Sequence, residues 1–427
     1  RTELTSTTRA GFQRYTFPKA DNAHILFDLA IPMEYYYGGH EILDACVKKV
    51  SDTEIEGYAQ HGGAAGYGHG VNQPNYPKDG KSGWQQYLLH FVIKFSKPFA
   101  SLGGWSGERT SQDLKEMTGK GDIGFFVNFS TEKGEVVKVK TGISFVSIEQ
   151  ARLNLETETG RFGWDFDAVR NYHRKTWNDL LSRIEIEGGT KTDRRKFYTN
   201  MYRAYCSRMI MSDVNGKYVD MYEKVQQLED PESPVYGCDA FWNTFWNLNQ
   251  LWALATPDLM NKWVKSLLEI NDKGGWLPRG PAGIEYSGIM TGEHEIALIV
   301  AAYQQGIRSF DAEKAYQAIK HMQTEPGRPH EAGGTVGNEN LKSYLELGYV
   351  PKEDGLVSDT LDYAYDDWCV AQMAKALGKE EDYKYFIKRA EKFKNMFDTS
   401  IGYMRPRHRD GSWRQDFDLW DCDQNRT

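Results

Sequence analysis

The sequence predicts a multidomain α and β protein in which an N-terminal β-sandwich precedes a helical domain of the (α/α)6-toroid type. Three observations lead to this prediction. The first 160 residues contain short runs of β-branched and aromatic residues separated by Gly, Pro, Asp and Lys. Near Gly160 the spacing of apolar residues changes from about two to about 3.6. Beyond Asp239, helical segments that are apolar all round alternate with amphipathic ones.

Several runs carry the strand prediction for the first domain. They are residues 23–33, 54–63, 85–99, 123–131, 134–148 and 150–158. Between Leu89 and Phe95 the apolar residues recur at the odd positions, which predicts one buried and one wetter face, as in a sandwich. The glycine-rich segment 61–70 lacks the GxGxxG spacing of a nucleotide-binding loop, so we interpret it as a long loop.

The helical part begins with an amphipathic segment from Phe166 to Ile184, and a second helix is predicted from Thr192 to Met211. Asn215-Gly216 then closes a turn. We therefore expect a β-sandwich domain at residues 1–160, a linker helix at 161–189 and a toroid domain at 190–427.

Alternating helix types predict the toroid. The segment 295–303 is apolar all round and suits a helix buried on every side, whereas 312–322 is amphipathic and follows an Asp311 cap. Segments 361–377 and 380–397 repeat this pair. Buried inner helices and amphipathic outer ones are what a toroid requires. About eight helices are expected, fewer than the roughly twelve of a closed ring, so the toroid is predicted to be incomplete. The weakly periodic stretch 321–354 is expected to be a long loop over a site.

Composition narrows the classes of function. The chain has 427 residues and a net charge of -8, with no basic block, so we expect no nucleic-acid partner. No apolar run reaches the length of a membrane span, so none is expected. The five cysteines are scattered without a CxxC motif, which argues against a zinc–thiolate site.

The stretch 237–306 combines five tryptophans with amide and carboxylate side chains. A sugar ring packs its C–H face on an aromatic ring while its hydroxyls need hydrogen-bond partners, so this mixture favours carbohydrate binding. A tryptophan-rich helical core with polar helix ends is the competing interpretation. The candidate substrate-binding residues are Asp239, Trp242, Asn243, Trp246, Glu293, His294, Glu295 and Asp366.

Motifs for other chemistries are missing. There is no GxSxG nucleophile, and His294-Glu295 is not part of an HExxH zinc motif because position 298 is leucine. Carboxylates beside aromatics favour glycoside hydrolysis, in which one carboxylic acid protonates the leaving oxygen and another carboxylate acts on water or the sugar. Asp366 and Asp367 are expected near a helix start, where capping or scaffold hydrogen bonding is favoured over substrate contact. For Glu293 and its neighbours the two roles are evenly balanced.

These segments together resemble glycoside hydrolase family 92, the calcium-dependent, inverting, exo-acting α-mannosidases. The motifs that carry the resemblance are FWNTFWNLNQLW at 241–252, GEHEIALIVAAYQQG at 292–306, LDYAYDDW at 361–368 and GYMRPR at 402–407, with RAGFQRYTFP at 9–18 and FSKPF at 95–99. The resemblance implies a site between sandwich and toroid, terminal α-mannose on N-glycans or mannans as substrate, and a calcium ion held by oxygen ligands. It further implies a secreted, periplasmic or cell-surface location.

The sequence departs from the family pattern in two ways. Asn243 and Trp246 stand where many members carry an acid that holds mannose hydroxyls and an arginine. The family motifs for the general acid, the base and the calcium ligands are not found before Thr427. The catalytic residues and metal ligands are therefore not assigned. Three hypotheses follow: an exo-α-mannosidase, a catalytically silent carbohydrate-binding protein, and a glycosidase or mannosyl-phosphate hydrolase of altered specificity.

Overall fold

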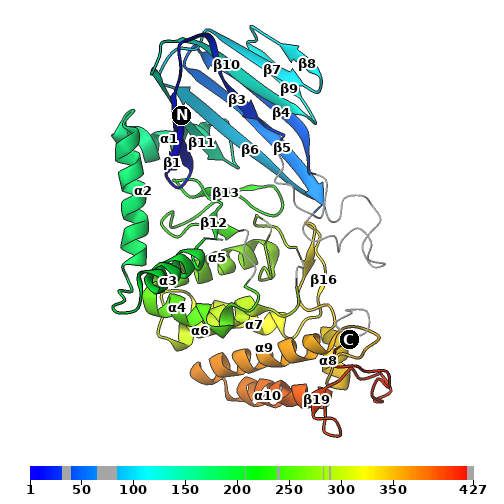
Figure 1. Cartoon of the computed structure of the whole chain (residues 1–427). Coiled ribbons are helices and arrows are strands. Elements are labelled where there is room, and N and C mark those ends of the chain that lie inside the picture. Colours follow the sequence, from blue (N-terminus) through cyan, green and yellow to red (C-terminus); the bar gives the residue numbers. More distant parts are fainter. Residues whose placement is uncertain are drawn as a thin grey trace. The chain divides into compact units, whose positions relative to one another are not determined.

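The computed structural model describes residues 1–30, 40–64, 84–206, 208–237, 241–281, 283–287 and 290–420. The chain forms two compact units. The first contains residues 1–206 and 210–234, and the second contains residues 207–209 and 235–427 (Figure 1). The segment expected to be a linker helix lies within the first unit.

The first unit is built on two antiparallel sheets (Figure 1). In the described residues the larger sheet has the order β1-β2-β11-β6-β5-β4-β9 and the smaller β3-β10-β7-β8. The strands are β1 (Thr2–Ser6), β2 (Ala10–Thr16), β3 (Ala20–Asp28), β4 (His40–Ser51), β5 (Glu54–Ala64), β6 (Trp84–Phe95), β7 (Ser101–Ser106), β8 (Arg109–Ser111), β9 (Glu116–Gly119), β10 (Ile123–Thr131) and β11 (Val136–Ser144). Because β5 runs to Ala64, the start of the predicted glycine-rich loop is strand instead, and residues 65–70 lie outside the described residues.

Apolar side chains from both sheets form one core, which confirms the predicted sandwich. Phe91, Ile93 and Phe95 of β6 are buried in this core, as the odd-position pattern predicted. Phe125 of β10 stacks on Phe27 of β3 with ring centroids 4.7 Å apart. Apolar burial of this kind is the main force that holds two sheets together.

Residues 150–158 were predicted as a strand, and this prediction is wrong. They lie in α1 (Ile148–Thr159), where the Ser147 side chain accepts the Gln150 N–H as an N-cap. Ala151 and Leu155, four residues apart, are buried against Val92 on the outer face of the larger sheet. The spacing of apolar residues in this run fits a strand as well as a helix. Only the packing of α1 on the sheet decides between them.

Two further helices complete the first unit: α2 (Phe166–Leu181) and α3 (Lys191–Arg203). The second helix was predicted to reach Met211, but it ends at Arg203, and β12 (Met209–Ile210) follows. The predicted turn is present. Its Asp213 carboxylate is buried and accepts hydrogen bonds from Ser144 Oγ at 2.9 Å and Asn154 Nδ2 at 2.7 Å, so the turn is tied to β11 and α1. The hairpin of β13 (Lys217–Val219) and β14 (Val225–Gln227) comes next.

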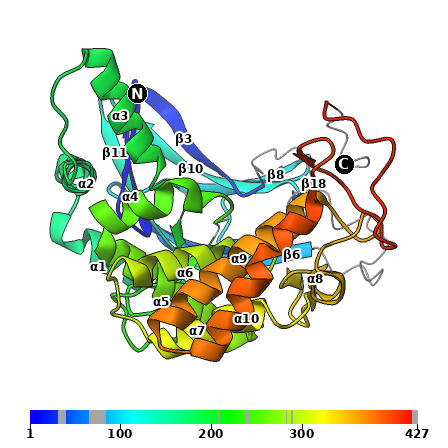
Figure 2. The same ribbon diagram turned by 90° about the horizontal axis from the view of Figure 1, so that it is seen from below.

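The second unit is helical (Figure 2). Its helices are α4 (Leu248–Ala255), α5 (Pro257–Gly274), α6 (His294–Gln304), α7 (Ala312–Met322), α8 (Leu341–Leu347), α9 (Val357–Ala376) and α10 (Glu380–Ala390), with 3-10 turns at Thr244–Trp246 and Glu391–Met396. Short strands are β15 (Tyr236–Gly237), β16 (Arg328–Pro329), β17 (Thr335–Val336), β18 (Phe397–Asp398) and β19 (Tyr403–Met404). The stretch 321–354, expected to be a loop, therefore includes the β16–β17 hairpin and α8.

Inner and outer helices alternate as predicted. α6 is buried on all sides and packs against α9, which in turn packs against α10 (Figure 2). Asp311 caps α7 by accepting the Lys314 N–H at 2.9 Å. The β-sandwich followed by inner and outer helices confirms the predicted fold class. No helix within the described ranges is both long enough and apolar enough to cross a membrane.

The boundaries of two helices differ from the prediction, and one difference bears on the candidate site. α9 begins at Val357, four residues before its predicted start, so Asp366 and Asp367 lie in the middle of the helix. The regular part of α10 ends at Ala390, and a 3-10 turn continues to Met396. A helix start cannot account for carboxylates placed in mid-helix, so they need other partners.

Candidate functional site

Most of the candidate residues meet at the first turn of α6. Gly292, which precedes it, has a φ of 77°, a conformation that glycine adopts without penalty. A Cβ there would lie 2.7 Å from His294 Nε2 and 3.0 Å from Asp362 Cβ. The neighbouring Thr291 hydroxyl donates to Asp362 at 2.7 Å. The glycine thus lets the chain enter α6 close against α9.

Asp366 caps α6 from a neighbouring helix. Its Oδ2 accepts the backbone N–H of Glu293 at 2.8 Å, which supplies one of the acceptors that the first turn of a helix lacks. Burial raises the pKa of Asp366 to about 8, although protonation of His294 and the bond from Glu293 favour the carboxylate. The scaffold role favoured for Asp366 is therefore present, in a cap that joins two helices.

Glu293 and Glu295 lie buried beside one buried cation. Arg279 Nη1 is 3.4 Å from Glu293 Oε1 and 3.4 Å from the carbonyl oxygen of Gly337. Burial raises the pKa of Glu293, while the Arg279 charge lowers it. Burial and the nearby Glu293 raise the pKa of Glu295 well above its ordinary value. Because one guanidinium can balance only one of these carboxylates, we infer that Glu295 keeps its proton at neutral pH.

His294 is also buried and has one defined tautomer. The backbone N–H of Asn243 donates to its Nδ1 at 3.0 Å, so Nδ1 carries no hydrogen and Nε2 does. Nε2 lies 3.9 Å from Asp362 Oδ1. Burial lowers the pKa of His294, but Asp362 and Asp366 raise it more, so the net shift is upward. The Asn243 bond opposes protonation, because an imidazolium has a hydrogen on both nitrogens.

The aromatic residues of the same site lie at the surface of the second unit. Trp242 is 48% exposed and Trp246 is 71% exposed. Between them, Asn243 is half-buried with a left-handed φ of 62°, and Phe245 packs its ring edge-on against His294 with centroids 4.9 Å apart. An exposed, flat apolar face beside a polar turn is compatible with a sugar ring.

The structure thus places the candidates in two groups. Glu293, His294, Glu295 and Asp366 are buried, which favours scaffold roles for them over the direct sugar contact predicted from the sequence. Trp242, Asn243 and Trp246 form the accessible group, joined to the buried one by the Asn243–His294 bond. Asp239 lies outside the described residues.

Sequence reasoning missed one residue of this network and one residue that follows its Gly337 acceptor. Arg279 was not considered, although it is a solitary cation in the Gly- and Pro-rich segment 274–283, and that isolation was the available signal. Asn338 was also missed; it is buried, and neither of its side-chain amide atoms has a hydrogen-bond partner within the described residues. Asn338 follows Gly337, which has a positive φ of 65°, and no regular spacing of apolar residues marks this position in the sequence.

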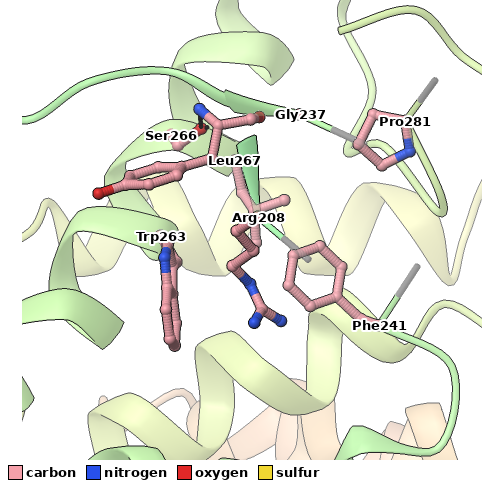
Figure 3. A pocket seen from close by; sticks show the side chains of 8 residues that line it. Arg208, Gly237, Phe241, Trp263, Ser266, Leu267 and Pro281 are labelled. Carbon is pink, nitrogen blue, oxygen red and sulfur yellow. Dashed lines mark hydrogen bonds between the residues drawn. The ribbon is translucent and has the colours of Figure 1, made fainter. Parts of the chain in front are cut away.

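Three of the five tryptophans in the stretch 237–306 belong to the core instead. Trp252, Trp263 and Trp276 are buried. The Arg208 guanidinium lies 4.1 Å from the Trp252 ring centroid and 4.2 Å from that of Trp263, as in a cation–π contact. Figure 3 shows this arginine between Trp263 and Phe241 at a small pocket. The protein's own cation thus covers these aromatic faces, and the core interpretation holds for them.

A metal ion does not fit the described side chains. Within the described ranges, no group of three or more His, Cys, Asp or Glu residues is arranged to hold a metal. The acidic cluster at α6 contains Arg279, and burial favours protonation of its carboxyls, both of which oppose a hard cation that needs charged or strongly polar oxygen ligands. No calcium ligands can be assigned among these residues.

Comparison with known proteins places both units in one family. Residues 1–144 match the model of the glycosyl hydrolase family 92 N-terminal domain, and residues 150–426 match that of the family 92 catalytic domain. An uncharacterised secreted glycosidase from Arthroderma benhamiae is 27% identical over 303 residues, which cover 65% of this chain and 34% of the relative.

Solved structures are similar over the whole chain. A family GH92 α-mannosidase from Bacteroides thetaiotaomicron matches with a TM-score of 0.84 and 27% identity, over 100% of this chain and 53% of the other. Its complex with mannoimidazole matches with a TM-score of 0.81 and 28% identity, over 98% of this chain and 51% of the other. An inverting GH92 mannosidase from the same organism matches with a TM-score of 0.81 and 26% identity, over 100% of this chain and 54% of the other. The chain spans about half the length of these solved relatives.

Proposed function

The chain belongs to glycosyl hydrolase family 92, and from this premise we propose that the protein removes terminal α-linked mannose from N-glycans or mannans by an inverting mechanism. Two of the solved relatives are named as mannosidases, one of them as inverting, and one was solved with mannoimidazole bound. These names support α-mannose as the sugar and inversion as the stereochemical course.

One observation in the structure carries the proposal furthest. The exposed Trp242 is followed by Asn243, whose main chain is held by a buried histidine. An aromatic face whose position is fixed by the protein interior can hold a sugar ring in one orientation, which hydrolysis of a terminal unit requires. The amide side chain of Asn243 would hydrogen-bond sugar hydroxyls without adding charge.

The buried acids support the site but do not perform the proton transfers. Glu293 pairs with Arg279, and Asp366 caps the same helix. Each carboxyl is committed to a neighbour in the interior, whereas a general acid or base must reach the glycosidic oxygen or a water molecule. No catalytic acid or base is assigned to these side chains. Calcium dependence is the property implied by the family resemblance.

Turnover by the full-length protein tests the proposal. We expect it to release mannose from 4-nitrophenyl α-D-mannopyranoside, with proton NMR showing β-mannose as the first product. Activity is expected to fall after treatment with a calcium chelator and to return when calcium is added. Retained activity after chelation refutes the metal requirement, and faster hydrolysis of the α-glucoside or of mannosyl phosphate refutes the mannoside as substrate.

A silent carbohydrate-binding protein is the second candidate, and the burial of Glu293, Glu295 and Asp366 favours it. This candidate predicts that mannoimidazole binds, as measured by calorimetry, while no mannoside or mannosyl phosphate is hydrolysed. We also propose that the protein acts outside the cytoplasm. This agrees with the description of its relative from Arthroderma benhamiae as a secreted glycosidase.

A further inference from the structure

We propose that His294 is a positioning residue, which holds the segment 242–246 for sugar binding by accepting a main-chain hydrogen bond from Asn243, while its other ring nitrogen faces the charge of Asp362. This inference rests on the proposed function for its ligand. It gives His294 a role different from the direct sugar contact expected from the sequence.

The first support is the geometry of the ring. Nδ1 accepts the Asn243 N–H at 3.0 Å, and Nε2 faces Asp362 Oδ1 at 3.9 Å. Asp362 is held in turn by the Thr291 hydroxyl at 2.7 Å. His294 is only 2% exposed, so its ring has little surface left for a ligand. The imidazole therefore connects the first turn of α6 to the main chain of the aromatic segment.

The second support is that this segment needs an external contact. Asn243 adopts a left-handed φ of 62°, which asparagine tolerates better than most residues other than glycine. Within the turn, the Thr244 N–H donates to Phe241 O at 3.0 Å and the Trp246 N–H to Asn243 O at 3.2 Å. Such local bonds shape the turn but do not attach it to the helices. The His294 bond, together with the Phe245 ring against His294 and Tyr365, makes that attachment.

The charges around the ring make the attachment sensitive to pH. Asp362 and Asp366 face it from α9 and Glu293 from the start of α6, while the aromatic segment presents the uncharged Phe245. Of these groups, Asp362 lies opposite Nε2 and its negative charge favours an imidazolium as pH falls. Once Nδ1 carries a proton, it no longer accepts the Asn243 N–H, and the segment is released. Sugar binding should therefore weaken at acid pH.

The test uses the full-length protein with His294→Leu, which removes the acceptor, and His294→Asn, whose side-chain oxygen stands close to the place of Nδ1. Hydrogen exchange of a peptide spanning 241–247 reports on the attachment, and calorimetry with mannoimidazole reports on binding. We expect His294→Leu to raise both the exchange rate and the Kd about five- to tenfold, as for loss of one hydrogen bond. We expect His294→Asn to stay within about twofold of the wild type and to lose the acid weakening of binding.

The variant Asp362→Asn tests the same inference with His294 unchanged. Removal of this negative charge should shift the acid weakening of binding to lower pH, and this variant decides the matter if His294→Leu does not fold. Wild-type protection and Kd in His294→Leu would overturn the inference, as would a His294→Asn protein that behaves like His294→Leu, since packing alone would then explain the residue. Failure of the wild type to bind mannoimidazole refutes the proposed function, while the exchange data still decide the role of His294.

Discussion

Replacement of Arg389 by methionine tests whether a buried ion pair holds α9, α10 and the end of α7 together. The Arg389 Nε donates to Asp367 Oδ2 at 2.7 Å, a second nitrogen donates to the other carboxylate oxygen, and the carbonyl oxygen of Gln323 accepts at 2.6 Å. Tyr344 donates to Asp367 at 2.8 Å. Asp367 is fully buried and Arg389 nearly so. The pair joins α9 to α10 and to the end of α7.

The expected cost follows from the charge that remains. Arg389→Met leaves Asp367 buried without its cation, and breaking such a pair typically costs about 3–5 kcal/mol. In a unit of this size that lowers Tm by roughly 6–20 °C. The double variant Arg389→Met with Asp367→Leu has no buried charge at this place, so it should recover most of the loss.

The pH dependence gives a second signature. Burial raises the pKa of Asp367 to about 6, and Arg389 opposes that rise. Without Arg389 the pKa of the folded state lies higher still, further above the unfolded value of about 3.9. Between the unfolded and folded pKa values of Asp367, the folded variant binds more protons than its unfolded state. The free energy of unfolding of the variant therefore falls as pH rises through neutrality.

Urea denaturation of the wild type, the single variant and the double variant at several pH values measures these differences. Comparison between variants cancels the other titrating groups. A loss below about 1 kcal/mol in Arg389→Met, or a double variant as unstable as the single one, refutes the reasoning about the buried charge.

The remaining predictions concern the start of α6 and use urea denaturation as the measurement. Glu295→Gln should cost less than about 1 kcal/mol because we infer that Glu295 is already neutral, whereas Glu293→Gln breaks the buried ion pair with Arg279 and should cost about 3 kcal/mol; equal costs would contradict the charge assignment. Asp366, with a folded pKa of about 8 above its unfolded value, should make the wild type less stable as pH rises toward 8, and Asp366→Asn should reduce that slope; an unchanged slope argues against the raised pKa. Gly292→Ala should cost about 2–4 kcal/mol of stability because of the positive φ and the close contacts of the added Cβ. Gly306→Ala is the control and should cost about 1 kcal/mol, because its φ is 87° but its Cβ would have no neighbour within 4 Å. Similar losses in the two variants would mean that the residues around the Gly292 Cβ move aside.

Local patterns in the chain were enough for most of the fold. Alternation at the odd positions of β6 follows directly from the two faces of a strand, and the all-apolar stretch of α6 follows from burial on every side. The same local reasoning failed at α1, because its side-chain pattern fits a strand as well as a helix, and only the outer face of the larger sheet decides between them.

The sequence by itself determined the residue types at the candidate site and the family that they resemble, since both are written in short contiguous motifs. It did not determine their roles. Asp366 and Glu293 are 73 positions apart, and His294 and Asn243 are 51 apart, yet each pair is joined by a hydrogen bond. Hydrogen bonds and charge pairing depend on distances of a few ångströms. Which carboxyls are buried, which one keeps its proton and which tryptophans remain accessible were therefore decided only when the helices packed together.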